Sequence, residues 1–75
     1  DAKAYEDNLK NINDLNKAIE DSYYWQNKLS ESQNYFDVEK ALTFILSPEE
    51  IESYQSQINE YKDTNLEYLQ NRERS

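Results

Sequence analysis

The chain has 75 residues, 16 acidic and 8 basic, and it contains no histidine, cysteine or glycine. A chain of this length forms one domain, placed at residues 1–75, and buries a thin core. The missing cysteine and histidine exclude disulfides and the commonest metal ligands, so we expect no metal and no cofactor, and a net charge of -8 argues against direct binding to nucleic acid.

The first segment, residues 2–29, carries apolar side chains at helical spacing. Five of them define one face: Tyr5, Leu9, Ile12, Ile19 and Tyr23. Recurrence at every seventh residue indicates an amphipathic helix with a coiled-coil-like stripe. The polar stretch 30–34 follows, and it predicts a turn in which Ser32 or Asn34 caps the next helix.

A second helix is predicted at residues 35–46, the most apolar part of the chain. One face is formed by four residues: Tyr35, Val38, Leu42 and Ile45. Phe36 and Phe44 lie well away from that face. A helix that is apolar on more than one side is normally buried on more than one side, so the second face is covered either within the chain or by a partner.

The third helix is predicted at residues 48–72, and its start is the clearest local signal in the sequence. Serine at 47 is a good N-cap, Pro48 suits the first helical position, and Glu50 completes a capping box. Further along, Tyr54, Tyr61 and Tyr68 recur at sevens. We interpret this tyrosine stripe as a seam between helices, with the hydroxyl groups reaching water.

A second series at sevens on this helix contains one polar residue. It consists of Ile51, Ile58 and Asn65. The seam lies either within one chain or between chains, and in the second case Asn65 would help to set the register at some loss of stability. The whole pattern predicts an all-α fold: a small antiparallel three-helix bundle with two long helices, one short central helix and coiled-coil-like packing.

The run Tyr23-Tyr24-Trp25 is the strongest indication of a binding surface. Successive helical positions point about 100° apart, so one seam cannot bury all three rings. Either the short helix covers one of them, or the exposed rings anchor a partner, since Trp and Tyr are enriched at binding hot spots. The candidate partner-binding residues are Tyr24, Trp25, Phe36 and Phe44.

These features predict that the chain is a non-enzymatic protein-interaction or assembly module. Self-association through the same surface is a close variant of this prediction. Phosphate-binding and calcium-binding loops are excluded by the missing glycine, and a bundle this small has little concave space for a small-molecule substrate. No apolar run is long enough to span a membrane. The chain begins with Asp1 rather than methionine, so we expect a processed or excised piece.

Two alternatives belong to other functional classes. An acidic inhibitor, or nucleic-acid mimic, would block a basic groove with clustered carboxylates, and its affinity would then fall steeply with salt. A structural coiled-coil fragment of a larger protein would use its two long helices as part of a rod.

Overall fold

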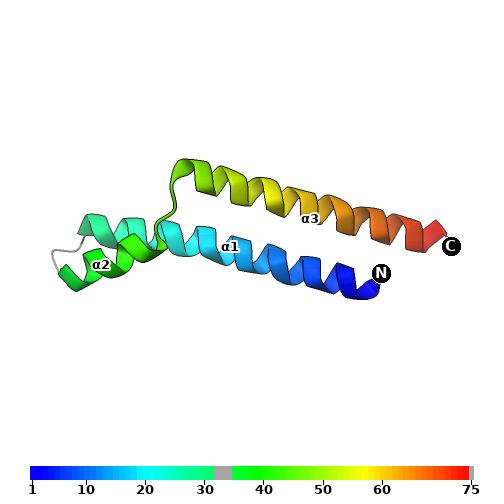
Figure 1. Ribbon diagram of the computed structural model, residues 1–75, viewed down its shortest axis with the longest axis horizontal. Coiled ribbons are helices and arrows are strands. Elements are labelled where there is room, and N and C mark those ends of the chain that lie inside the picture. The colour runs from blue at the N-terminus through cyan, green and yellow to red at the C-terminus, as the bar shows by residue number, and fades with distance from the viewer. Residues whose placement is uncertain (32–34, 75) are drawn as a thin grey trace.

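The computed structural model describes residues 1–31 and 35–74, apart from the side chains of 35, 36 and 74. This part of the chain forms three helices: α1 (Ala2–Glu31), α2 (Tyr35–Phe44) and α3 (Pro48–Arg74). The predicted all-α fold with two long helices and one short central helix is therefore confirmed (Figure 1). The predicted caps Ser32 and Asn34 lie outside the described residues.

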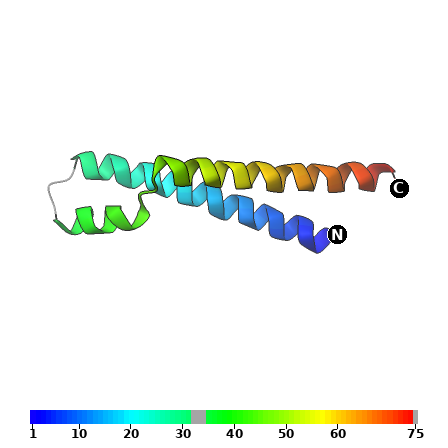
Figure 2. The ribbon, with the colours of Figure 1, turned by 45° about the horizontal axis from the view of Figure 1, so that its top comes forward.

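The helix α1 packs against both other helices. Its C-terminal part lies beside α2 and its remaining length lies beside α3, both running antiparallel to it (Figures 1 and 2). Within the described residues, α2 and α3 do not pack against each other. The fold measures 59 × 20 × 14 Å, so it is only about two helices thick at any level.

The radius of gyration is larger than that of a compact domain, because α2 and α3 lie at different levels along α1. It is 16.8 Å, compared with about 11 Å for a compact domain of this length. The apolar residues buried in the described part are Ile12, Ala41 and Ile58. A core this small leaves apolar surface on α1 and α3 in contact with water.

Two polar residues, Asn65 and Ser22, complete the buried set. The Oδ1 atom of Asn65 accepts a hydrogen bond from Nδ2 of Asn8 at 3.0 Å, and its Nδ2 donates to the backbone carbonyl of Tyr5 at 3.3 Å. These bonds join α3 to α1 at one axial position. A shift of register would leave the Asn65 amide buried without them, as expected for an amide within an apolar series.

The connection between α2 and α3 uses a side chain of α1 to end the short helix. The N–H of Ile45 still bonds to the carbonyl of Ala41, at 2.9 Å, but the N–H of Leu46 donates to Oγ of Ser22 at 2.9 Å. The predicted end at residue 46 is therefore wrong, and α2 ends at Phe44. The cause is this tertiary bond, which replaces the next helical one.

The four-residue face predicted for α2 is not buried as a unit. Leu42 on that face is 65% exposed, while its neighbour Ala41 is fully buried. Adjacent helical positions point about 100° apart, so both cannot face α1. The C-terminal ends of α1 and α3 lie at Glu31 and Arg74, each two residues beyond its predicted position.

The predicted capping box at the start of α3 is present. The N–H of Glu50 donates to Oγ of Ser47 at 3.1 Å, and the N–H of Ser47 donates to Oε1 of Glu50 at 3.0 Å. The carbonyl of Ser47 accepts the first helical bond, from Ile51. Pro48 has no N–H to satisfy.

The Ser47→Ala variant is expected to lose about 1 kcal/mol of unfolding free energy, because the N–H of Glu50 loses its side-chain acceptor. Urea unfolding followed by circular dichroism measures this loss. The Ser56→Ala variant changes an exposed serine in the middle of the same helix and serves as the control. Equal unfolding free energies for the two variants would mean that the cap contributes nothing.

Candidate functional site

Three of the four predicted partner-binding residues lie together at one edge of the α1–α2 pair. The rings of Tyr24 and Trp25 meet edge to face, with centroids 5.2 Å apart and planes at 89°. Trp25 stacks on Phe44 of α2, with centroids 5.9 Å apart and planes at 14°. We call these three residues the aromatic cluster. The fourth predicted residue, Phe36, has a side chain outside the described residues.

Two lysines cover rings of the aromatic cluster. The Nζ atom of Lys28 lies 5.7 Å from the centre of the Tyr24 ring, and Nζ of Lys40 lies 5.3 Å from that of Trp25. Each such contact contributes about 0.5–1 kcal/mol at an exposed site. Two of the chain's 8 basic residues are thus placed on the rings, and the surface presents both apolar and positively charged groups.

The members of the cluster differ in exposure. Trp25 is half-buried, because Phe44 of α2 stacks against it, whereas Tyr24 is 52% exposed. The short helix therefore covers Trp25 and leaves Tyr24 at the surface. Trp25 and Phe44 hold α2 against α1, and Tyr24 is the member most accessible to a partner.

The tyrosine stripe of α3 occupies a different place. Tyr54, Tyr61 and Tyr68 are each half-buried, and the ring of Tyr68 lies 5.4 Å from that of Tyr5 on α1. This contact crosses from one long helix to the other within the chain. Tyr68 therefore lies at the seam between α1 and α3.

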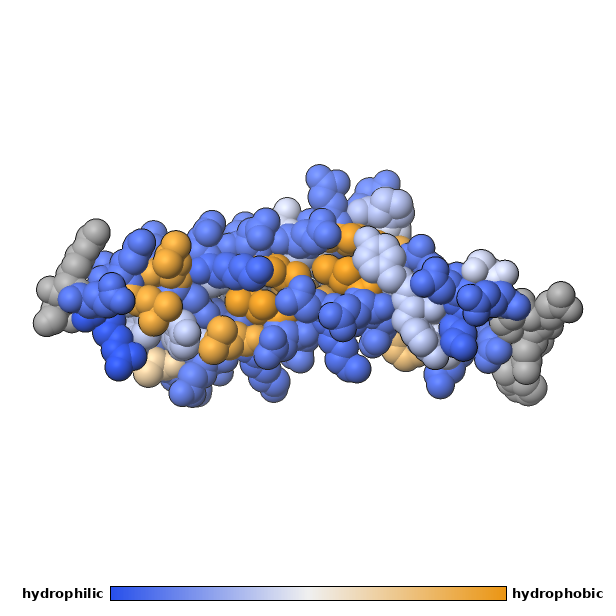
Figure 3. Space-filling view, turned by 180° about the vertical axis from the view of Figure 1, so that it is seen from behind, coloured by the Kyte–Doolittle hydropathy of each residue, from blue (hydrophilic) through white to orange (hydrophobic). Residues whose placement is uncertain are grey.

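The sequence did not predict a second surface, which we call the apolar face of the α1–α3 pair. Figure 3 shows apolar residues gathered along the middle of this side of the molecule. At its end near α2 is an open groove of about 1140 Å³, the junction groove. Its apolar lining comes from α1, α3 and the connection between α2 and α3: Tyr23, Leu29, Ile45, Leu46, Pro48 and Ile51.

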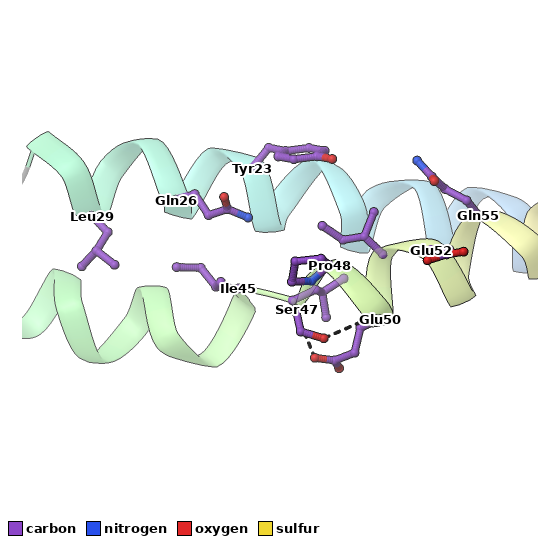
Figure 4. Close-up of a pocket in the computed structure, with 11 residues that line it drawn as sticks. Tyr23, Gln26, Leu29, Ile45, Ser47, Pro48, Glu50, Glu52 and Gln55 are labelled. Atoms are coloured by element: carbon purple, nitrogen blue, oxygen red, sulfur yellow. Dashed lines mark hydrogen bonds between the residues drawn. The ribbon is translucent and has the colours of Figure 1, made fainter.

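The junction groove exists because α3 begins beside the middle of α1 rather than at its C-terminal end. Figure 4 shows Leu29 and Ile45 between α1 and α2, with Pro48 where the chain enters α3. It also shows Glu50 turned toward Ser47, with which it forms the two capping bonds.

The other end of the apolar face has a shallower depression of about 290 Å³, the seam depression. It is lined by Tyr5, Leu9, Ile12, Lys62, Asn65, Leu66 and Leu69. Its leucines are open to water, and Leu66 is the most exposed of them at 53%. Periodicity alone did not single out Leu66, because it lies one residue beyond the series that ends at Asn65.

The described residues offer neither a metal site nor a membrane-spanning helix. No group of three acidic side chains there is arranged to hold a metal ion, and no described helix is long and apolar enough to cross a membrane. Comparison with known proteins finds no matching family model, no similar characterised protein and no similar solved structure.

Proposed function

We propose that this chain is a non-enzymatic protein-interaction module that binds another protein through the aromatic cluster. The observation that supports this proposal is the contact set Tyr24–Trp25–Phe44 at an exposed edge, with Tyr24 half open to solvent. Large aromatic side chains supply most of the binding energy at protein interfaces. A ring already fixed by its neighbours loses little conformational entropy when a partner covers it.

The two lysines indicate the chemistry of the partner. Lys28 and Lys40 place positive charge on the rings of a chain whose net charge is -8. A partner that fits this surface presents apolar groups toward Tyr24 and carboxylates toward the lysines. The carboxylates would give the contact its orientation and raise its association rate.

Replacing Tyr24 with alanine tests the proposal without disturbing the core. Tyr24 is 52% exposed, and the adjacent Tyr23, which is 50% exposed and lines the junction groove, provides a matched control. A partner recovered from native cells on the immobilised full chain is purified, and its dissociation constant is measured. Tyr24→Ala is expected to raise this constant about 30-fold, the loss typical of a hot spot.

The Tyr23→Ala control distinguishes the loss of a specific contact at Tyr24 from a general weakening of binding. Tyr23→Ala is expected to leave the dissociation constant within about threefold of the original, because small surface changes outside a hot spot have little effect. Circular dichroism is expected to show the same helicity for both variants. Unchanged binding by Tyr24→Ala would refute the proposal, as would equal weakening by the two variants.

A further inference from the structure

We propose that the apolar face of the α1–α3 pair binds a second copy of this chain, so that two molecules form a four-helix bundle. Each molecule contributes α1 and α3, and the two pairs pack across their apolar faces. Four helices packed in this way enclose a core that two helices alone leave open. The proposal is independent of the proposed function, because it concerns a different side of α1.

The pattern of residues along the face suits a helical interface. On α1 the face follows one strip with alternating spacings of four and three residues: Tyr5, Leu9, Ile12, Asn16, Ile19 and Tyr23. On α3 it follows a similar strip: Ile51, Gln55, Ile58, Lys62, Asn65 and Leu69. Neither strip contains an acidic residue, although the chain has 16 of them. Depletion of charge is characteristic of the centre of protein interfaces.

The long helices give the face the length of a helical interface. The helix α3 has 27 residues, which corresponds to a length of about 40 Å. A specific interface usually takes about 800 Å² from each partner, so the second copy would cover both α1 and α3 along this length. The seam depression and the junction groove give this face hollows in which side chains of the other copy can pack.

The charges at the two ends of the face are complementary. Lys62 lines the seam depression, and Glu52 lines the junction groove. A two-fold axis near Ile58 turns the second copy antiparallel to the first. Each Lys62 then lies toward Glu52 of the other molecule, and the same contact occurs twice, as two-fold symmetry requires.

The thin core provides the driving force. Leu9, Leu66 and Leu69 are exposed in one molecule, and a dimer removes them from water. Chains of this size usually need a disulfide, a metal or a partner chain in addition to their own core. This chain has no cysteine and no histidine, so helix packing and association with another chain are the remaining supports.

Dimerisation would also have a consequence for recognition. Tyr23 lines the junction groove, whereas Tyr24 packs against Trp25, and successive helical positions point about 100° apart. The dimer therefore keeps both aromatic clusters outside its interface. Two such clusters on one particle can engage a partner that has two sites more tightly than either cluster alone.

Sedimentation equilibrium of the full chain tests the proposal. The measurement covers about 1 μM to about 1 mM chain in about 0.15 M salt, which screens repulsion between the outer carboxylates. The expected mass is twice the 9.0 kDa of one chain. The Leu66→Glu variant is expected to raise the dissociation constant of the dimer by about tenfold or more, since a charged carboxylate would replace an apolar side chain that the interface covers.

Two further variants make the test specific. Leu42 is 65% exposed on α2, so Leu42→Glu adds the same charge outside the interface and is expected to leave the dimer intact. Lys62→Glu is expected to weaken the dimer, and the double variant Lys62→Glu/Glu52→Lys is expected to restore it. An original chain that stays at 9.0 kDa over the whole range would overturn the proposal, as would a Leu66→Glu variant that dimerises normally.

Discussion

Replacing Ile58 with alanine is expected to lower the free energy of unfolding by about 2–3 kcal/mol. Ile58 is 5% exposed and is one of the few buried apolar side chains of the described residues. The substitution removes apolar contact area and leaves a cavity between α1 and α3. The expected loss lies in the lower part of the usual range because two helices with an open side can move together and partly fill the cavity.

This loss is large for so small a protein. A chain of 75 residues typically has about 4–11 kcal/mol of unfolding free energy in total. Urea unfolding followed by circular dichroism, at equal protein concentrations, measures the change. Leu42→Ala serves as the control, since Leu42 is 65% exposed and surface substitutions usually stay within about 0.5 kcal/mol. Equal losses in the two variants would contradict the packing described above.

Replacing Ser22 with alanine is expected to lower the free energy of unfolding by about 1–3 kcal/mol. The side chain of Ser22 is fully buried, and its Oγ accepts hydrogen bonds from the N–H of Leu46 and from Nε2 of Gln26. Alanine removes the acceptor but not the donors. The partly buried N–H of Leu46 then loses its partner at the point where the chain leaves α2.

A closely matched control exists on α3. There Nε2 of Gln57 donates to Oγ of Ser53 in the same four-residue arrangement, but the pair is exposed. The Ser53→Ala variant is expected to change stability by only a few tenths of a kcal/mol, because alanine also favours the helix. Thermal and urea unfolding compare the two variants. A loss for Ser53→Ala as large as that for Ser22→Ala would show that the tertiary bond to Leu46 is unimportant.

The parts of the fold that depend on local sequence were predictable. Helical periodicity predicted the long helices, and the capping box of Ser47 and Glu50 predicted the first residue of α3. Asn65 stood out because it interrupts an isoleucine series, and it does lie at the seam between α1 and α3. Each of these predictions rests on residues that lie within a few helical turns of one another.

The parts that depend on tertiary contact were not predictable. Nothing near residue 46 in the sequence indicates that Ser22, 24 positions earlier, ends α2. Periodicity also does not encode how α2 is turned on α1, which buries Ala41 and exposes Leu42. The apolar face was missed because the sequence does not show that α2 and α3 lie at different levels along α1.

The candidate site was predictable in part for a related reason. Tyr24 and Trp25 were singled out because three successive aromatic residues cannot share one seam, and Phe44 because it lies off the main face of α2. The contact between Trp25 and Phe44 joins two helices, so it depends on tertiary packing. The two lysines were missed, since Lys40 reaches Trp25 only after α2 packs on α1.

The neighbouring residues Tyr23 and Tyr24 are proposed to belong to two different interaction surfaces, one for a second copy of the chain and one for another protein. Photo-crosslinking in native cells tests it most directly, with a benzophenone side chain placed at one of the two positions in the full chain. Position 23 is expected to give a product of two copies of the chain, and position 24 a product with a different protein. The same product from both positions, or no product from either, would contradict the claim.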